Sequence, residues 1–308
     1  MVVARAAKPQ PQPQPHNSSA SMVVFERDAF LRLLTTRVVG RRLEYHDRVP
    51  STMGLADALL KAEGAAAAHG AVVLAETQTA GVGRRGRSWE SAPAGNLYFS
   101  LVWAPAGGSD PAKAMPELVR LNLASGVAVV GATAAAGVPG ARIKWPNDVW
   151  AGVTPRKLSG MLLNFGGGGA AVLGVGINVL EDMRWNASAT SVATLLAPQP
   201  PPPEADAEAC AAAPPLPTPS REALLATFCN ELERLMGAST EDVLAEYREH
   251  DLLRGRTVRV HHRTREEDDP RDYDAEVLGV DKDGMLRVKG PGGDALLSGE
   301  EVSITPQL

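Results

Sequence analysis

The sequence predicts an α+β protein whose core is a mixed β-sheet. Strand-like and helix-like segments follow one another without the strict alternation that a doubly wound parallel sheet requires. The chain has 308 residues, and its hydrophobic content of 44% is enough to bury a full core. From Arg256 onward the pattern changes to short strands separated by turn signals, which indicates a second, smaller β unit.

The N-terminal part of the chain is expected to be a tail followed by a helix, a strand and a second helix. Residues 1–24 contain no acidic residue and include PQPQPQP, which favours a solvated, disordered tail. The periodicity predicts a helix over 26–37, a strand over 41–52 that runs into a turn, and a helix over 53–64 that Gly64 ends.

The middle of the chain carries most of the predicted sheet. A buried strand leads into a Gly/Arg-rich segment, a second apolar strand leaves it, and a long Ala/Val-rich helix and three more strands follow. The predicted strands are 71–77, 96–103, 141–145, 157–165 and 171–179, and the long helix is 116–136.

The last third of the chain begins with a Pro/Ala-rich insert, residues 197–220, which cannot form a core. Two helices are predicted after it, and Ser239 is a good cap for the second. Their ranges are 221–237 and 240–250, and five strands follow at 256–262, 273–280, 285–290, 295–299 and 301–305, with the charged stretch 263–272 as a hairpin loop. We therefore divide the chain into a tail (1–24), a main domain (25–250) and a small β domain (251–308).

Composition limits the classes of function and the compartment. The net charge of −5 and pI near 5.7 argue against a general nucleic-acid binder. The two cysteines, Cys210 and Cys229, have neither a disulfide framework nor a metal-ligand spacing, so a reducing compartment is expected. We find no run of eighteen apolar residues and expect no membrane span. The tail favours a cytoplasmic protein, with a plastid or mitochondrion as the alternative if it is a transit peptide.

The segment GVGRRGRSW, residues 81–89, is both flexible and positive. Glycines allow unusual backbone conformations and a close approach to a ligand, while neighbouring arginines repel one another unless an anion lies between them. The segment fits either an anion-binding loop that is disordered until its anion arrives or a solvated turn.

Three further polar or glycine-rich stretches lie at predicted strand ends. KWPNDV (144–149) exposes Lys144, Asn147 and Asp148 at a turn, RKLSG (156–160) places a lysine at a strand edge, and GVGIN (174–178) allows a close approach to the backbone. Each stretch alone also fits a plain structural role.

Taken together with Ser51-Thr52 and Gln78, these four motifs resemble the biotin protein ligase family, and the resemblance runs from about residue 43 to the C-terminus. It implies a class II aminoacyl-tRNA-synthetase-like mixed sheet for the main domain and an SH3-like β-barrel for the small one. Two extra residues separate KWPND from RKLSG, and the Pro-rich insert is longer than usual. The family's N-terminal DNA-binding unit has no counterpart here, so the resemblance implies a ligase without repressor function.

The resemblance also implies a reaction. The family joins biotin to ATP to form biotinyl-5′-adenylate, and then transfers the biotinyl group to one lysine of a biotin carboxyl carrier domain. Because a carboxylate must approach a phosphate, cations must offset their repulsion. Arg84, Arg87 and Lys157 would supply this charge together with Mg²⁺, and Lys157, Arg84 and Asp148 are the implied catalytic residues.

The implied ligand contacts fall into two sets. Biotin would be bound by Ser51, Thr52, Gln78, Gly83, Arg84 and Lys157. The nucleotide would be bound by Arg84, Arg87, Trp89, Asn147 and Asn178. Asp148 would either accept a proton from the acceptor lysine or coordinate Mg²⁺. This chain departs from the family at Met53, where an asparagine is usual, and at Val82, where an arginine is usual.

Two other functions stay open on the sequence. A lipoate-type ligase shares the catalytic fold and the acyl-adenylate strategy, and a non-enzymatic binding module would combine a basic loop with an SH3-like domain. The expected partner is a biotin carboxyl carrier domain, with no nucleic acid and no membrane; the sequence does not indicate an oligomeric state.

Overall fold

The computed structural model of the chain describes residues 24–91, 95–184, 186–197, 217–262, 271–299 and 302–306. The predicted tail, nearly all of the Pro/Ala-rich insert and most of the charged stretch 263–272 therefore lie outside the described residues.

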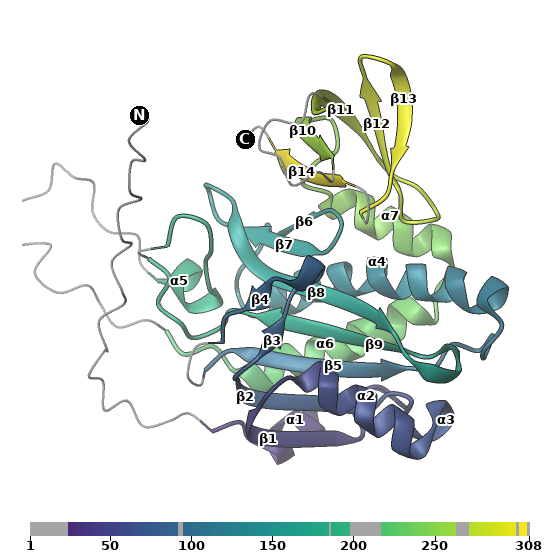
Figure 1. The fold of residues 1–308 in the computed structure, drawn as a ribbon. Helices are drawn as coiled ribbons and strands as arrows, with labels where there is room; N and C mark the ends of the chain where they lie inside the picture. Colours follow the sequence, from purple (N-terminus) through teal and green to yellow (C-terminus); the bar gives the residue numbers. More distant parts are fainter. Residues whose placement is uncertain are drawn as a thin grey trace, which may run out of the picture.

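A seven-stranded sheet forms the centre of the molecule (Figure 1). Its first two strands pair in parallel and every other neighbouring pair is antiparallel, so the predicted mixed sheet is confirmed. The strand order is β1 (Leu43–Val49), β2 (Val72–Gln78), β5 (Leu97–Trp103), β9 (Ala171–Ile177), β8 (Arg156–Phe165), β7 (Asp148–Ala151) and β6 (Arg142–Lys144).

Both faces of this sheet are covered, because successive side chains of a strand point to opposite faces. Val73 packs in a cluster with Ala56 and Leu60 of the helix α2, whereas Leu74 packs in the main core. Burial on both sides explains why the central strands read as continuous apolar runs. On one face lie α2 (Thr52–Glu63) and α3 (Ala65–Ala68), and the main core includes side chains of α1 (Arg27–Leu33), α4 (Pro111–Ala135), α6 (Arg221–Met236) and α7 (Thr240–His250).

Several boundaries differ from the prediction. The first helix ends at Leu33 rather than at residue 37. The helix α4 begins five residues earlier than predicted, because the Asp110 side chain caps it by accepting a hydrogen bond from the Ala112 amide and Pro111 occupies its first position. Local sequence pattern did not predict several short elements, among them α3, β7 and α5 (Val192–Leu196).

Within the described residues, one stretch of α4, Ala112–Ala135, is long and apolar enough to cross a membrane. The sequence analysis did not find it, because glycines and polar residues interrupt the apolar run. About two thirds of its most apolar window, 67%, is buried inside the protein itself, as expected of a core helix.

The five predicted C-terminal strands form a second, antiparallel sheet beside α7 and β6 (Figure 1). Two hydrogen bonds connect this part of the chain to the central sheet. The Trp145 indole donates to the Gly284 carbonyl at 3.0 Å, and the amide of Leu252, which precedes β10, donates to the Ile143 carbonyl at 2.8 Å. The strand order is β13 (Gly293–Leu297), β12 (Leu286–Gly290), β11 (Tyr273–Val280), β10 (Thr257–His262) and β14 (Val302–Pro306).

A buried ion pair joins the helix α6 to the strand β2. Arg221, the first residue of α6, lies 2.6 Å from Glu76 of β2, and both side chains are almost completely buried. The Tyr45 hydroxyl and the Phe25 amide also donate to Glu76. Burial alone would raise the pKa of Glu76, but hydrogen bonds from Arg221 and Tyr45 outweigh it and hold this pKa below its usual value.

We predict that Arg221→Met lowers the free energy of unfolding by about 3–5 kcal/mol, because it leaves the Glu76 carboxylate buried without its cation. The double variant Glu76→Gln/Arg221→Met should lose less than the single variant, since no uncompensated charge remains. Urea unfolding at neutral pH measures both differences.

The matched control is Arg248→Met, which removes an arginine from an exposed pair with Glu241. It should change the free energy of unfolding by less than about 1 kcal/mol. If Arg221→Met were as mild as this control, the buried pair would not hold α6 against β2.

Candidate active site

The Gly/Arg-rich segment forms an ordered hairpin, here named the Gly/Arg hairpin (residues 81–89). Its strands β3 (Gly81–Val82) and β4 (Ser88–Trp89) pair in antiparallel fashion, and the Gly83 amide donates to the Arg87 carbonyl at 2.7 Å. Arg85 and Gly86, with φ of 61° and 69°, turn the chain between them in the left-handed region. The structure thus gives the segment as a short hairpin with a tight turn at Arg85 and Gly86.

The hairpin covers a pocket of about 470 Å³ that is open to solvent. Most of the predicted ligand-binding residues meet there, from five separate segments of the chain. The predicted residues in its lining are Ser51, Thr52, Gln78, Gly83, Arg84, Trp89, Asn147 and Lys157. The rest of the lining is apolar or glycine: Met53, Val82, Phe99, Gly160, Met161, Leu162, Gly174, Val175 and Gly176.

Two glycines in β8 and β9 make room for the indole of Trp89. A Cβ at Gly160 would lie 2.8 Å from this ring, and one at Gly176 would lie 2.5 Å from it. Of the two GVGIN glycines, Gly176 therefore makes room for the hairpin's own tryptophan, whereas a Cβ at Gly174 would lie 2.7 Å from the Met53 sulfur. The Lys157 ammonium lies 5.2 Å from the ring centroid, within the range of a cation–π interaction. The buried indole Nε1 has no hydrogen-bond partner within the described residues.

One end of the pocket carries neutral polar groups. The Thr52 amide and hydroxyl donate to the Gln78 side-chain oxygen at 2.9 and 3.2 Å, and the hydroxyls of Thr52 and Ser100 lie 2.8 Å apart. The Ser51 hydroxyl is buried, and the described part of the chain offers it no partner. An unsatisfied buried hydroxyl is costly, so this one is well placed to bind a polar group of a ligand.

The other end of the pocket carries cations. The Arg84 guanidinium donates to the Asn147 side-chain oxygen at 3.2 Å, and the Lys157 ammonium lies 2.8 Å from the Asp148 carboxylate. Burial lowers the pKa of Lys144. The nearby positive charges of Lys157 and Arg84 lower this pKa further, whereas the negative charge of Asp148 acts to raise it. Positive charge gathered at one wall of a pocket favours an anionic ligand.

Three predicted residues lie outside the lining. Asp148 is beside it, paired with Lys157, and Arg87 is exposed on the hairpin. Asn178 is buried, and its side chain donates to the Thr190 carbonyl at 3.0 Å. It therefore fixes the segment that runs along Lys157, whose amide donates to the Ser188 carbonyl and whose carbonyl accepts from the Thr190 amide.

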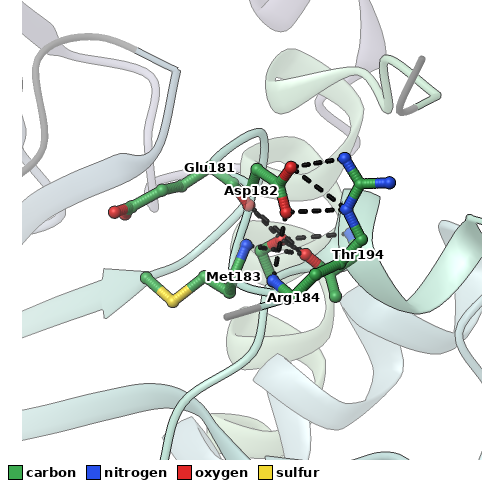
Figure 2. Close-up of polar contacts among 6 residues, drawn as sticks. Glu181, Asp182, Met183, Arg184 and Thr194 are labelled. Atoms are coloured by element: carbon green, nitrogen blue, oxygen red, sulfur yellow. Dashed lines mark hydrogen bonds and ion pairs between the residues drawn. The ribbon is translucent and has the colours of Figure 1, made fainter. Parts of the chain in front are cut away.

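Polar contacts hold the rest of this segment in place (Figure 2). The Met183 amide donates to the Thr194 hydroxyl at 3.0 Å, and Arg184 pairs with Asp182. The Ser191 hydroxyl caps α5 by accepting a hydrogen bond from the Thr194 amide. This support for Lys157 was not predicted, although Ser191 before VATLL is a recognisable helix start.

The part of the chain that the structure describes contains no group of three or more His, Cys, Asp or Glu side chains that could hold a metal ion. Asp148 offers one carboxylate near the pocket, and it is already paired with Lys157. Mg²⁺ often uses only one or two protein carboxylates and takes its other ligands from phosphates and water. Asp148 is therefore the carboxylate that would fit a magnesium ion arriving with a nucleotide.

Comparison with known proteins agrees with this geometry. Residues 45–179 match the model of the Biotin/lipoate A/B protein ligase family. The chain is 31% identical to the biotin--[acetyl-CoA-carboxylase] ligase of Mycobacterium tuberculosis, over 67% of this chain and 70% of that protein. It is 40% identical to the bifunctional ligase/repressor BirA of Escherichia coli, over 36% of this chain and 33% of BirA.

The match thus spans about a third of the length of the E. coli relative. The fold resembles that of the biotin protein ligase of Aquifex aeolicus solved in complex with biotin and ATP. That likeness has a TM-score of 0.61 at 22% identity and covers 87% of this chain and 100% of the other. The shared sequence motifs, the shared fold and the convergence of those motifs on one pocket show that this chain belongs to the biotin protein ligase family.

Proposed function

We propose that this protein is an ATP-dependent biotin protein ligase. It forms biotinyl-5′-adenylate and transfers biotin to a lysine of a biotin carboxyl carrier domain. The observation that carries the proposal is that one pocket is lined by neutral polar groups at Ser51, Thr52 and Gln78 and by cations at Arg84 and Lys157. Strands β5 and β9 lie between β2, which ends at Gln78, and β8, which carries Lys157, so the two sets occupy different ends of the pocket. Biotin has the same division, with a neutral ureido head and a carboxylate tail, and the apolar lining between the two ends suits its ring and chain.

The first step joins two anions. A biotin carboxylate oxygen attacks the α-phosphorus of ATP, the bond to the bridging oxygen breaks, and pyrophosphate leaves with the electron pair. Lys157 and Arg84 offset the repulsion, and Asn147 holds the Arg84 guanidinium at the pocket wall. A Mg²⁺ ion that arrives with the nucleotide would supply further positive charge. Trp89 and the hairpin exclude water from the adenylate.

The second step needs a neutral amine. The acceptor lysine, whose unperturbed pKa is about 10.4, must lose a proton before it attacks the acyl carbon and displaces AMP. Asp148 is the carboxylate next to Lys157 and is suited to accept this proton. Its pairing with Lys157 lets the same cation support both steps.

The finer fold assignment belongs to the same proposal. We propose that the main sheet is of the class II synthetase type and that the five C-terminal strands form an SH3-like barrel. Five short antiparallel strands and the bulge between Val277 and Gly279 in β11 support the second assignment, since bulges help small sheets to curve.

The function is tested by exchange of labelled pyrophosphate into ATP. We expect exchange that depends on biotin and that lipoate does not support, because the Ser51, Thr52 and Gln78 groups can satisfy a ureido head but find no partner on a dithiolane ring. Exchange with lipoate alone would make the protein a lipoate-type ligase. A folded protein without exchange for either acid would not be a ligase of this kind.

Lys157→Ala is expected to lower kcat for adenylate formation by about 10²–10³-fold, because one fixed cation at the developing charge is lost. Its stability should be nearly unchanged, since the ion pair with Asp148 is partly exposed. The control Lys61→Ala removes a lysine from the exposed pair with Asp57 and should leave kcat unchanged. Equal kcat values for the two variants would remove Lys157 from the mechanism.

Arg84→Gly should separate formation of the adenylate from its retention. The variant should still consume biotin and ATP, but it should release biotinyl-adenylate, because the hairpin no longer holds the phosphate. Biotin that appears on lysines of an added bystander protein measures the release. Wild-type retention by Arg84→Gly would contradict this role.

A further inference from the structure

The loop between β13 and β14 reaches the Gly/Arg hairpin. Its Gly299 carbonyl accepts a hydrogen bond from Arg84 at 2.5 Å and another from Arg85 at 3.0 Å. The donors and the acceptor are more than 210 residues apart in the sequence. Arg84 and Arg85 lie in the turn between β3 and β4, whereas Gly299 follows β13 of the C-terminal sheet. The C-terminal sheet is therefore in direct contact with the residue that we place at the phosphate.

Gly299 is also packed closely, so that a side chain here would have to displace its neighbours. A Cβ at this position would lie 3.0 Å from the Arg84 guanidinium and 3.1 Å from the Pro146 ring. Its φ lies outside the left-handed region, so space and not backbone conformation favours glycine here. Trp145 also donates to the Gly284 carbonyl in the turn between β11 and β12, so the C-terminal sheet touches the KWPND motif at a second point.

The chemistry of this contact makes it exchangeable. A backbone carbonyl is a neutral acceptor, and here two guanidinium groups share it. A phosphate carries full negative charge and accepts paired hydrogen bonds from a guanidinium, so it binds arginine more strongly. Before the nucleotide binds, the Gly299 carbonyl keeps Arg84 and Arg85 near the pocket. When the nucleotide binds, its phosphate can replace the carbonyl as the acceptor of their hydrogen bonds.

We infer that Gly299 is a positioning residue that latches the Gly/Arg hairpin over the pocket through Arg84 and Arg85, an inference that rests on the proposed ligase function for its catalytic consequence. By this latch the C-terminal sheet sets how far the hairpin is closed before the nucleotide binds. It also supports the closed hairpin while the adenylate is held.

The latch itself is tested without any activity. In Gly299→Val the added side chain displaces the Arg84 guanidinium, so trypsin should cleave the ligand-free protein after Arg84, Arg85 or Arg87 about tenfold faster, in proportion to the open population. Mass spectrometry identifies these sites. The control Gly292→Val lies in the β12–β13 turn with nothing near its Cβ and should be cleaved at the wild-type rate. Wild-type cleavage of Gly299→Val would overturn the latch.

A double-variant comparison tests the catalytic consequence. Gly299→Val should release biotinyl-adenylate about tenfold faster in the wild-type background and less than about twofold faster in the Arg84→Ala background, because the effect passes through Arg84. Equal acceleration in both backgrounds would mean that Gly299 acts elsewhere. Absence of adenylate in the wild-type protein would refute the proposed function, whereas the trypsin result would still decide the latch.

Discussion

The buried ion pair between Arg221 and Glu76 is the interaction on which the arrangement of the pocket depends. It ties the start of α6 to β2, the strand that ends at Gln78 and continues into the Gly/Arg hairpin. Phe25 and Tyr45 donate to the same carboxylate, so the first helix segment and the edge strand β1 are fixed at this point too. A charge buried this deeply is stable only with its partners in place, which makes the whole cluster cooperative.

The strand β2 leads into the Gly/Arg hairpin, and the hairpin forms the pocket by packing its Trp89 ring closely against Gly160 and Gly176. The hairpin lies on the sheet because β8 and β9 carry no side chain where the Trp89 indole sits. With the tryptophan seated, Arg84 faces Asn147 and Lys157 lies over the ring. The positions of Arg84 and Lys157 thus depend on two uncharged residues, Gly160 and Gly176, which leave room for the Trp89 ring.

Much of this could be predicted from the sequence. The mixed sheet, the helices α2, α6 and α7, the Ser239 cap and the family follow from local patterns and motifs, because those features are encoded within a few neighbouring residues. The seating of Trp89 on the sheet, the supporting position of Asn178 and the contact at Gly299 could not be predicted. Each depends on a partner far away in the chain, and short-range composition carries no information about such a partner.

The parallel pairing of β1 with β2 gives the two ends of the pocket different origins. Because both strands end at the same edge of the sheet, Val49 lies beside Gln78, and Ser51 and Thr52 follow directly. The neutral end is thus the product of one compact βαβ unit, while the cationic end draws Arg84, Asn147 and Lys157 from three separated segments. Under the proposed function, recognition of the uncharged ligand head depends on one contiguous part of the chain, whereas activation of the carboxylate depends on segments that only the complete fold brings together.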